Sequence, residues 1–94
     1  MRQSVEYGKY KIGEWNTNGF NSLSNPYNTI FKKTVISILN LDILILVETH
    51  CLQNDIIEVE DYKVIQYNRQ NVSRNAIRGS GGVAILISNN ILGS

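Results

Sequence analysis

The distribution of hydrophobic residues along the chain predicts four strands. Residues 9–16 alternate in polarity and end in the turn-forming stretch Asn16-Thr17-Asn18-Gly19. Residues 41–47 are an almost continuous aliphatic run, which is typical of a strand that is covered on both faces. Residues 62–67 predict a third strand, and residues 83–87 predict a fourth that is bounded by turn-forming glycines and asparagines.

A helix is predicted between the first two strands, because Ser24 or Asn25 can cap it and Pro26 suits its first position. Hydrophobic residues recur there every three or four positions, so we expect an amphipathic helix whose apolar stripe packs on another apolar surface. The stripe consists of Tyr27, Phe31, Val35, Ile38 and Leu39, and the opposite face carries Thr29, Lys33, Ser37 and Asn40. The mostly polar residues 53–61 are expected to hold one helical turn at most, near residues 56–57.

These elements predict an α/β fold with a mixed sheet and the order β-α-β-β-β. The first strand, the helix and the second strand make a βαβ unit. Its connection, from residue 17 to residue 41, has 25 residues. A parallel crossover needs only about 10–12 residues. We therefore expect the first two strands to be parallel neighbours.

Composition limits the chain to one small domain of 94 residues. Nine basic and eight acidic residues leave a net charge of +1, which excludes a polybasic arm or an acidic tail. The single cysteine, Cys51, excludes a disulfide framework. The longest uninterrupted aliphatic run, residues 43–47, is far shorter than the ~20 residues that span a bilayer. With no secretory signal at the start, we expect a soluble intracellular protein without a membrane partner.

The most informative polar residues stand where the first two strands end. The carboxyl ends of parallel neighbours meet at one edge of a sheet, so Asn16 and Glu48 are expected to converge there, with Asn18 within reach. A carboxylate beside a carboxamide suits a hard cation such as Mg²⁺. The alternative is that Asn16 only completes a turn and that Glu48 is an exposed residue after a strand.

Other candidate sites are weaker. Arg69, Arg74 and Arg78 lie in a stretch without acidic residues, from residue 62 to residue 94, and this loop either contacts phosphates or is simply solvated. His50 and Cys51 cannot make a zinc site, because the chain has no other histidine or cysteine. The glycines at 79–82 precede a strand rather than a helix, so we interpret them as turn residues and not as a phosphate loop.

Three motifs occur in order along the chain. They are W-N-T-N-G-F at residues 15–20, D-I-L-I-L-V-E-T-H at residues 42–50, and R-G-S-G-G-V-A-I-L-I-S at residues 78–88. Together they resemble the N-terminal half of the endonuclease/exonuclease/phosphatase superfamily, over about residues 9–91. The branch that they resemble most is the apurinic-type endonuclease domain of non-LTR (LINE-like) retrotransposons.

The resemblance implies the N-terminal half of a four-layer α/β sandwich, with residues 1–94 as a partial domain. It implies that Glu48 binds a catalytic Mg²⁺, for which Mn²⁺ can substitute, and that Asn16 supports this site. Asn18 would lie beside the same site. Arg69, Arg74 and Arg78 would approach the DNA. The metal would stabilise charge on the phosphodiester and its leaving oxygen. No small-molecule cofactor is implied, and a retrotransposon protein would act in the nucleus.

The chain also departs from the family pattern. The family's catalytic tyrosine, its D-x-N motif and its terminal aspartate–histidine pair would all follow residue 94, and His50 does not correspond to the catalytic histidine. We therefore expect a fragment that does not nick DNA alone. Alternatives are a fragment of an abasic-site repair nuclease or phosphoesterase of the same superfamily, or a non-enzymatic α/β binding module.

Overall fold

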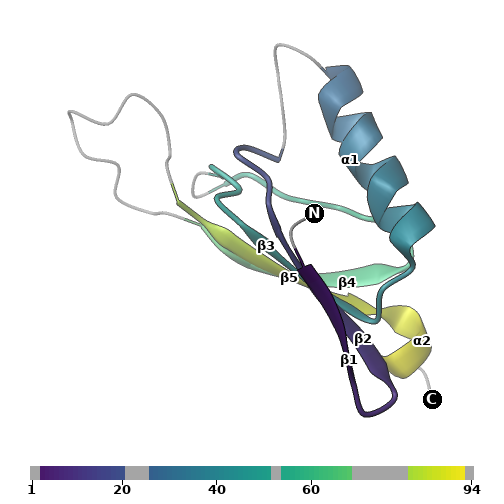
Figure 1. Ribbon diagram of the computed structural model, residues 1–94. Helices are drawn as coiled ribbons and strands as arrows, with labels where there is room; N and C mark the ends of the chain where they lie inside the picture. Colours follow the sequence, from purple (N-terminus) through teal and green to yellow (C-terminus); the bar gives the residue numbers. More distant parts are fainter. Residues whose placement is uncertain (1–2, 21–25, 52–53, 69–80, 93–94) are drawn as a thin grey trace.

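The computed structural model describes residues 3–20, 26–51, 54–68 and 81–92. They form a small α/β domain with a mixed sheet, as the sequence predicts. In chain order, the elements are β1 (Gln3–Tyr7), β2 (Tyr10–Asn16), α1 (Pro26–Leu39), β3 (Ile43–Val47), β4 (Tyr62–Tyr67), β5 (Val83–Ser88) and α2 (Asn89–Leu92). Figure 1 shows α1 on one side of the sheet and α2 as a continuation of β5.

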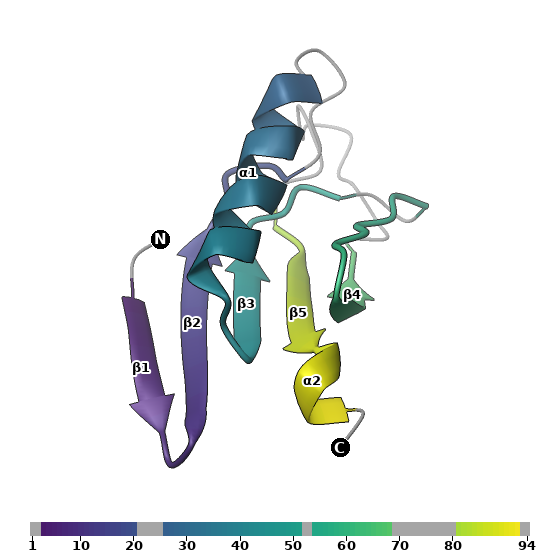
Figure 2. The ribbon, with the colours of Figure 1, turned by 90° about the vertical axis from the view of Figure 1, so that its right-hand side faces the viewer.

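The described strands form one sheet in the order β1-β2-β3-β5-β4. β2 and β3 are parallel, which confirms the expected βαβ unit, and every other pair is antiparallel. Figure 2 shows this order, with α1 lying across β2 and β3. Because β2 and β3 are parallel and adjacent, both end at the same edge, where β5 begins.

Three local features differ from the sequence prediction. β1 was not expected; it pairs with β2 through a tight hairpin in which Gly8 has a positive φ of 62°. The short helix α2 was not expected either. Residues 56–57 form no helical turn, because the Ile57 N–H donates to the side chain of Gln66 at 2.6 Å and holds this segment extended beside β4.

The core lies between α1 and the sheet face that it covers. Alternate residues of the two central strands supply its floor, and all of them are fully buried: Leu44, Leu46, Ala84 and Leu86. Phe20, Ile36, Cys51 and Ile57 cover them. The Tyr62 hydroxyl closes one end by donating to the carbonyl of Leu41 at 2.7 Å. Burial raises the pKa of this phenol, so the donor keeps its proton.

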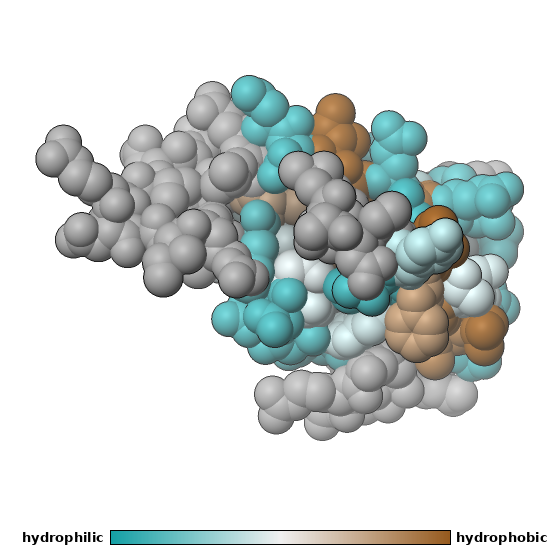
Figure 3. Space-filling model, turned by 90° about the horizontal axis from the view of Figure 1, so that it is seen from above, coloured by the Kyte–Doolittle hydropathy of each residue, from teal (hydrophilic) through white to brown (hydrophobic). Residues whose placement is uncertain are grey.

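The predicted orientation of α1 is wrong for most of its apolar stripe. Tyr27, Phe31 and Ile38 point to solvent, together with Ile30, and Figure 3 shows apolar side chains at the surface on the side where α1 lies. Two polar side chains cause this orientation: the Thr29 hydroxyl and the Lys32 ammonium donate to carbonyls of the loop after β2. These bonds turn Ile36 towards the core and the stripe away from it.

The opposite face of the sheet is also apolar, and no described helix crosses it (Figure 1). Because side chains alternate along a strand, this face collects the residues that lie between the core positions. We call it the open face, and its apolar members are all partly or largely exposed. In β2 to β5, they are Tyr10 and Ile12 of β2; Ile43, Ile45 and Val47 of β3; Ile65 and Tyr67 of β4; and Val83, Ile85 and Ile87 of β5.

Ile36 and Ile38 provide a test of the orientation of α1, because their exposed fractions are 1% and 76%. Ile36→Ala leaves a cavity and is expected to lower the free energy of unfolding by about 2–5 kcal/mol. Ile38→Ala should change it by less than about 0.5 kcal/mol. Urea denaturation followed by circular dichroism measures both. A larger loss of stability for Ile38→Ala than for Ile36→Ala would indicate that the apolar stripe is the buried face of α1 after all.

Candidate functional site

Asn16 and Glu48 lie next to each other at the edge where β2 and β3 end. Asn16 is paired in register with Val47, so Glu48 begins the neighbouring loop one residue later. The Asn16 side-chain amide donates a hydrogen bond to the Glu48 carboxylate. The structure therefore brings together the two residues that the strand pattern singled out, and both side chains are exposed.

The carboxamide of Asn16 is held in one orientation. Its oxygen accepts a hydrogen bond from the Asn18 N–H at 3.2 Å, while its nitrogen faces Glu48. Asn16 thus completes a turn and orients a carboxylate at the same time. The two interpretations left open by the sequence are not exclusive, because one amide makes both contacts.

The backbone around Glu48 is left-handed and firmly held. Glu48 has a φ of 50° and His50 a φ of 58°, a conformation that costs a non-glycine residue roughly 1–2 kcal/mol. The Glu48 carbonyl accepts hydrogen bonds from the Gly19 N–H at 2.8 Å and from the Thr17 hydroxyl at 3.1 Å. Strained backbone persists only where its surroundings fix it, and such positions cluster at functional sites.

The start of β5 supports this loop from the other side. The N–H groups of Thr49 and His50 donate to the carbonyls of Gly82 and Gly81, at 3.2 and 2.8 Å. Gly82 has a φ of 89°, and a Cβ built on it would lie 2.5 Å from the Thr49 hydroxyl. Of the glycines that the sequence analysis interprets as turn residues, Gly79 lies outside the described residues. Gly81 and Gly82 both have a positive φ, and Gly82 is required for the close approach of Thr49.

Sequence reasoning missed three residues that position this edge. Thr17 and Thr49 are buried among the loops, and their hydroxyls bond to backbone groups there. Lys32 reaches across from α1, and its ammonium donates to the Gly19 carbonyl at 2.6 Å; burial lowers the pKa of this lysine. The turn-forming sequence T-N-G after the strand is a signal for Thr17. No sequence pattern indicates that a lysine of the helix donates a hydrogen bond to this turn.

Of the remaining predicted site residues, the structure describes Asn18. Asn18 is exposed at the same edge and has a left-handed φ of 48°. Arg69, Arg74 and Arg78 lie outside the described residues.

The donor set at the edge fits a cation that keeps most of its water. Glu48 supplies carboxylate oxygens, whereas Asn16 turns its nitrogen to Glu48 and orients it. Within the described residues, no group of three or more histidine, cysteine, aspartate or glutamate side chains could enclose a metal ion. Mg²⁺ tolerates such an open site, because it binds through one or two carboxylates, several waters and the phosphate of a substrate. Glu48 is therefore the residue that would hold the metal.

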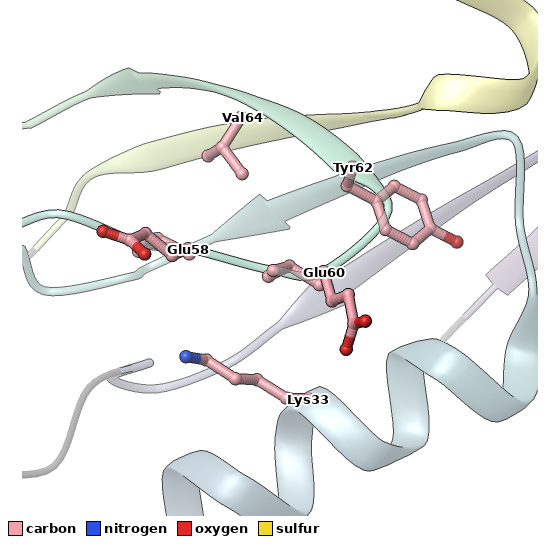
Figure 4. Close-up of a pocket in the computed structure, with 7 residues that line it drawn as sticks. Lys33, Glu58, Glu60, Tyr62 and Val64 are labelled. Atoms are coloured by element: carbon pink, nitrogen blue, oxygen red, sulfur yellow. The ribbon is translucent and has the colours of Figure 1, made fainter.

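A groove of about 660 Å³ lies away from this edge, between α1 and the start of β4. Lys33 lines it from the helix, and Glu58 and Glu60 line it from the facing segment (Figure 4). Its walls are otherwise apolar, and none of the residues at the carboxyl edge contributes to it. The groove is therefore separate from the edge that carries Asn16 and Glu48.

Comparison with protein-family models and with curated proteins finds no match to the chain. Among the described residues, no helix has the length and hydrophobicity needed to cross a membrane. The functional interpretation therefore depends on the geometry of the edge and on the resemblance of its motifs.

The close approach at Gly82 can be tested against Gly81, which has a similar φ of 87° but open space around its Cβ position. Gly81→Ala should cost about 1–2 kcal/mol of stability, from backbone strain alone. Gly82→Ala should cost at least about 1 kcal/mol of stability more than Gly81→Ala, because its methyl group overlaps the Thr49 hydroxyl.

Thr49→Ala removes that overlap. In this background, the cost of Gly82→Ala in urea denaturation should fall to that of Gly81→Ala. Equal costs of the two glycine substitutions in the wild-type background would contradict the proposed contact.

Proposed function

We propose that this chain is the N-terminal part of a Mg²⁺-dependent DNA endonuclease of the retrotransposon type. The observation that carries the proposal is the hydrogen-bonded pair of Asn16 and Glu48 at the carboxyl edge of β2 and β3. Ligands of open α/β sheets bind at such an edge. The residues of the pair belong to two of the three motifs by which the chain resembles the superfamily.

In this proposal, Glu48 holds Mg²⁺ and Asn16 keeps the carboxylate in place. When bound, the metal would stabilise negative charge on the phosphodiester. Asn18 stands beside the site, where it could contact the DNA backbone, and Arg69, Arg74 and Arg78 would add phosphate contacts from the loop before β5. The chain's own part is to fix one carboxylate on a loop that hydrogen bonds with Gly19, Thr17 and Gly82 hold on both sides.

The open face supports the finer interpretation of the fold, in which this sheet is half of a four-layer sandwich. Two sheets in a sandwich pack through apolar inner faces about 10 Å apart. A surface formed by isoleucine and valine from four adjacent strands has the character of such an inner face. In the proposed enzyme, a second sheet covers it and brings the remaining catalytic groups to the same edge.

Binding of Mn²⁺ to the purified chain tests the metal site directly. The paramagnetic ion should broaden the amide NMR signals of Asn16, Asn18 and Glu48 before all others, and Mg²⁺ should compete with it. Glu48→Gln should abolish this selective broadening. Asn16→Ala should weaken it by about 10- to 100-fold, the usual cost of removing a group that orients a metal ligand.

Glu14→Gln is the matched control, because Glu14 is an exposed carboxylate on the same strand, two residues before Asn16. This variant should bind Mn²⁺ as the wild type does. Uniform broadening, or broadening that survives Glu48→Gln, would refute the assignment of Glu48 as the metal ligand.

A further inference from the structure

The side of α1 that faces away from the sheet is apolar. It carries four large side chains whose exposed fractions lie between 59% and 78%: Tyr27, Ile30, Phe31 and Ile38. Among the described elements, none lies over this side of the helix (Figure 2), and Figure 3 shows apolar side chains at the surface there. A contiguous exposed apolar patch is the mark of an interaction surface.

The exposed residues are spaced like the contact row of a helix–helix pair. Four of them follow one another at intervals of four, three and four positions: Tyr27, Phe31, Thr34 and Ile38. Residues at these intervals form a single row along a helix, as the contact positions of a coiled coil do. We call these four residues the outer row. It lies opposite the buried Ile36, so α1 packs on the sheet with one side and exposes the outer row on the other.

Polar and charged groups do not oppose the burial of the outer row. The Thr34 hydroxyl donates to the Ile30 carbonyl at 2.9 Å, so this polar group already has a partner within the helix. The only charged residues of α1 are Lys32 and Lys33. Lys32 bonds to the Gly19 carbonyl on the core side, and Lys33 lines the groove beside β4. Two copies of the outer row can therefore meet without bringing like charges together.

We propose that the outer row binds a second copy of this chain, through an antiparallel pair of α1 helices related by a two-fold axis. The axis crosses α1 between Phe31 and Thr34. It places Tyr27 of each copy opposite Ile38 of the other, and Phe31 of each copy opposite Thr34 of the other. Every layer of the contact then joins one aromatic side chain to one β-branched side chain.

The order of large and small residues favours the antiparallel direction. In a parallel pair, each residue of the outer row would meet its own symmetry mate. Phe31 would then face Phe31 in a crowded layer, and the next layer would hold only two threonines. Well-packed interfaces instead place large residues opposite smaller ones. The dipoles of two helices also attract each other when the helices are antiparallel. The outer row is thus complementary to itself in the antiparallel arrangement.

The exposed area indicates a weak dimer. A fully exposed side chain of this size presents roughly 150–200 Å², so the four apolar side chains of α1 together expose about 500 Å². Two copies would bury about 1,000 Å², the lower limit for a specific interface. We therefore expect a dissociation constant at the micromolar level or weaker. The dimer uses neither the open face nor the metal site, so it does not rest on the proposed function.

Sedimentation velocity of the full chain, from micromolar to millimolar concentration, tests the association. The wild type should pass from monomer to dimer and stop there. Phe31→Glu should raise the dissociation constant at least tenfold, because it brings two carboxylates together beside the axis. Far-UV circular dichroism should show that this variant melts as the wild type does, since Phe31 is exposed.

Tyr67→Glu is the matched control. Tyr67 is an aromatic residue of the open face, and its exposed fraction of 64% is close to the 65% of Phe31. This variant should dimerise as the wild type does. A monomeric Tyr67→Glu together with a dimeric Phe31→Glu would show that the open face associates instead, and would overturn the proposal.

Disulfide cross-linking tests the direction of the two helices. Tyr27→Cys chains mixed with Ile38→Cys chains should form a mixed disulfide under mild oxidation, which mass spectrometry identifies when one variant is isotopically labelled. Each variant alone should cross-link no more than the wild type, whose Cys51 is buried. In the antiparallel pair, residue 27 lies about 16 Å along the helix from its own symmetry mate, too far for a disulfide.

Efficient cross-linking of Tyr27→Cys to itself would indicate a parallel pair and would overturn the proposed arrangement. A wild type that stays monomeric up to millimolar concentration would exclude a second copy as the occupant of the outer row. A dimer that Phe31→Glu leaves unchanged would do the same.

Discussion

The parallel pairing of β2 with β3 is the constraint on which the rest of the structure depends. It brings the ends of two strands, far apart in sequence, to one edge, and it places the Asn16 amide beside the Glu48 carboxylate. The pairing continues beyond the strands, because Thr17, Gly19 and Phe20 donate in turn to the carbonyls of Val47, Glu48 and Thr49. The loops at this edge are therefore as firmly bonded as a sheet, although their backbone is left-handed at Glu48.

The same edge explains the orientation of α1. The spacing of apolar residues identifies a helix and its apolar stripe. It does not show which face of the helix packs on the sheet when polar side chains of another face donate hydrogen bonds to the backbone of a neighbouring loop. Here Lys32 and Thr29 bond to the carbonyls of Gly19 and Phe20, and Ile36 on their side of the helix fills the core. The long stem of a lysine packs on apolar surface while its ammonium remains hydrogen-bonded. A hydropathy pattern that treats lysine only as a polar residue predicts that Lys32 points to solvent.

Sequence reasoning reached the βαβ unit, the later two strands and the adjacency of Asn16 to Glu48, because these follow from short-range periodicity and from the geometry of parallel strands. It did not reach β1, whose hairpin depends on a left-handed Gly8, or the extended segment near Ile57, which a side chain of β4 holds from nine residues away. Nor did it reach the roles of Thr17 and Gly82. These are set by contacts between loops distant in sequence, and no local pattern encodes such contacts.

Among the described residues, two apolar surfaces are exposed, one on α1 and one on the open face of the sheet. On α1, the exposed Tyr27, Phe31 and Ile38 follow one another at spacings of four and seven residues. The open face is formed by residues of the adjacent strands β2, β3, β5 and β4. The proposed sandwich meets a physical need of this face, since an aliphatic sheet face in water is stabilised when a second sheet covers it. The candidate metal site at the edge is built from β2, β3 and their loops, so its geometry does not depend on what covers the open face.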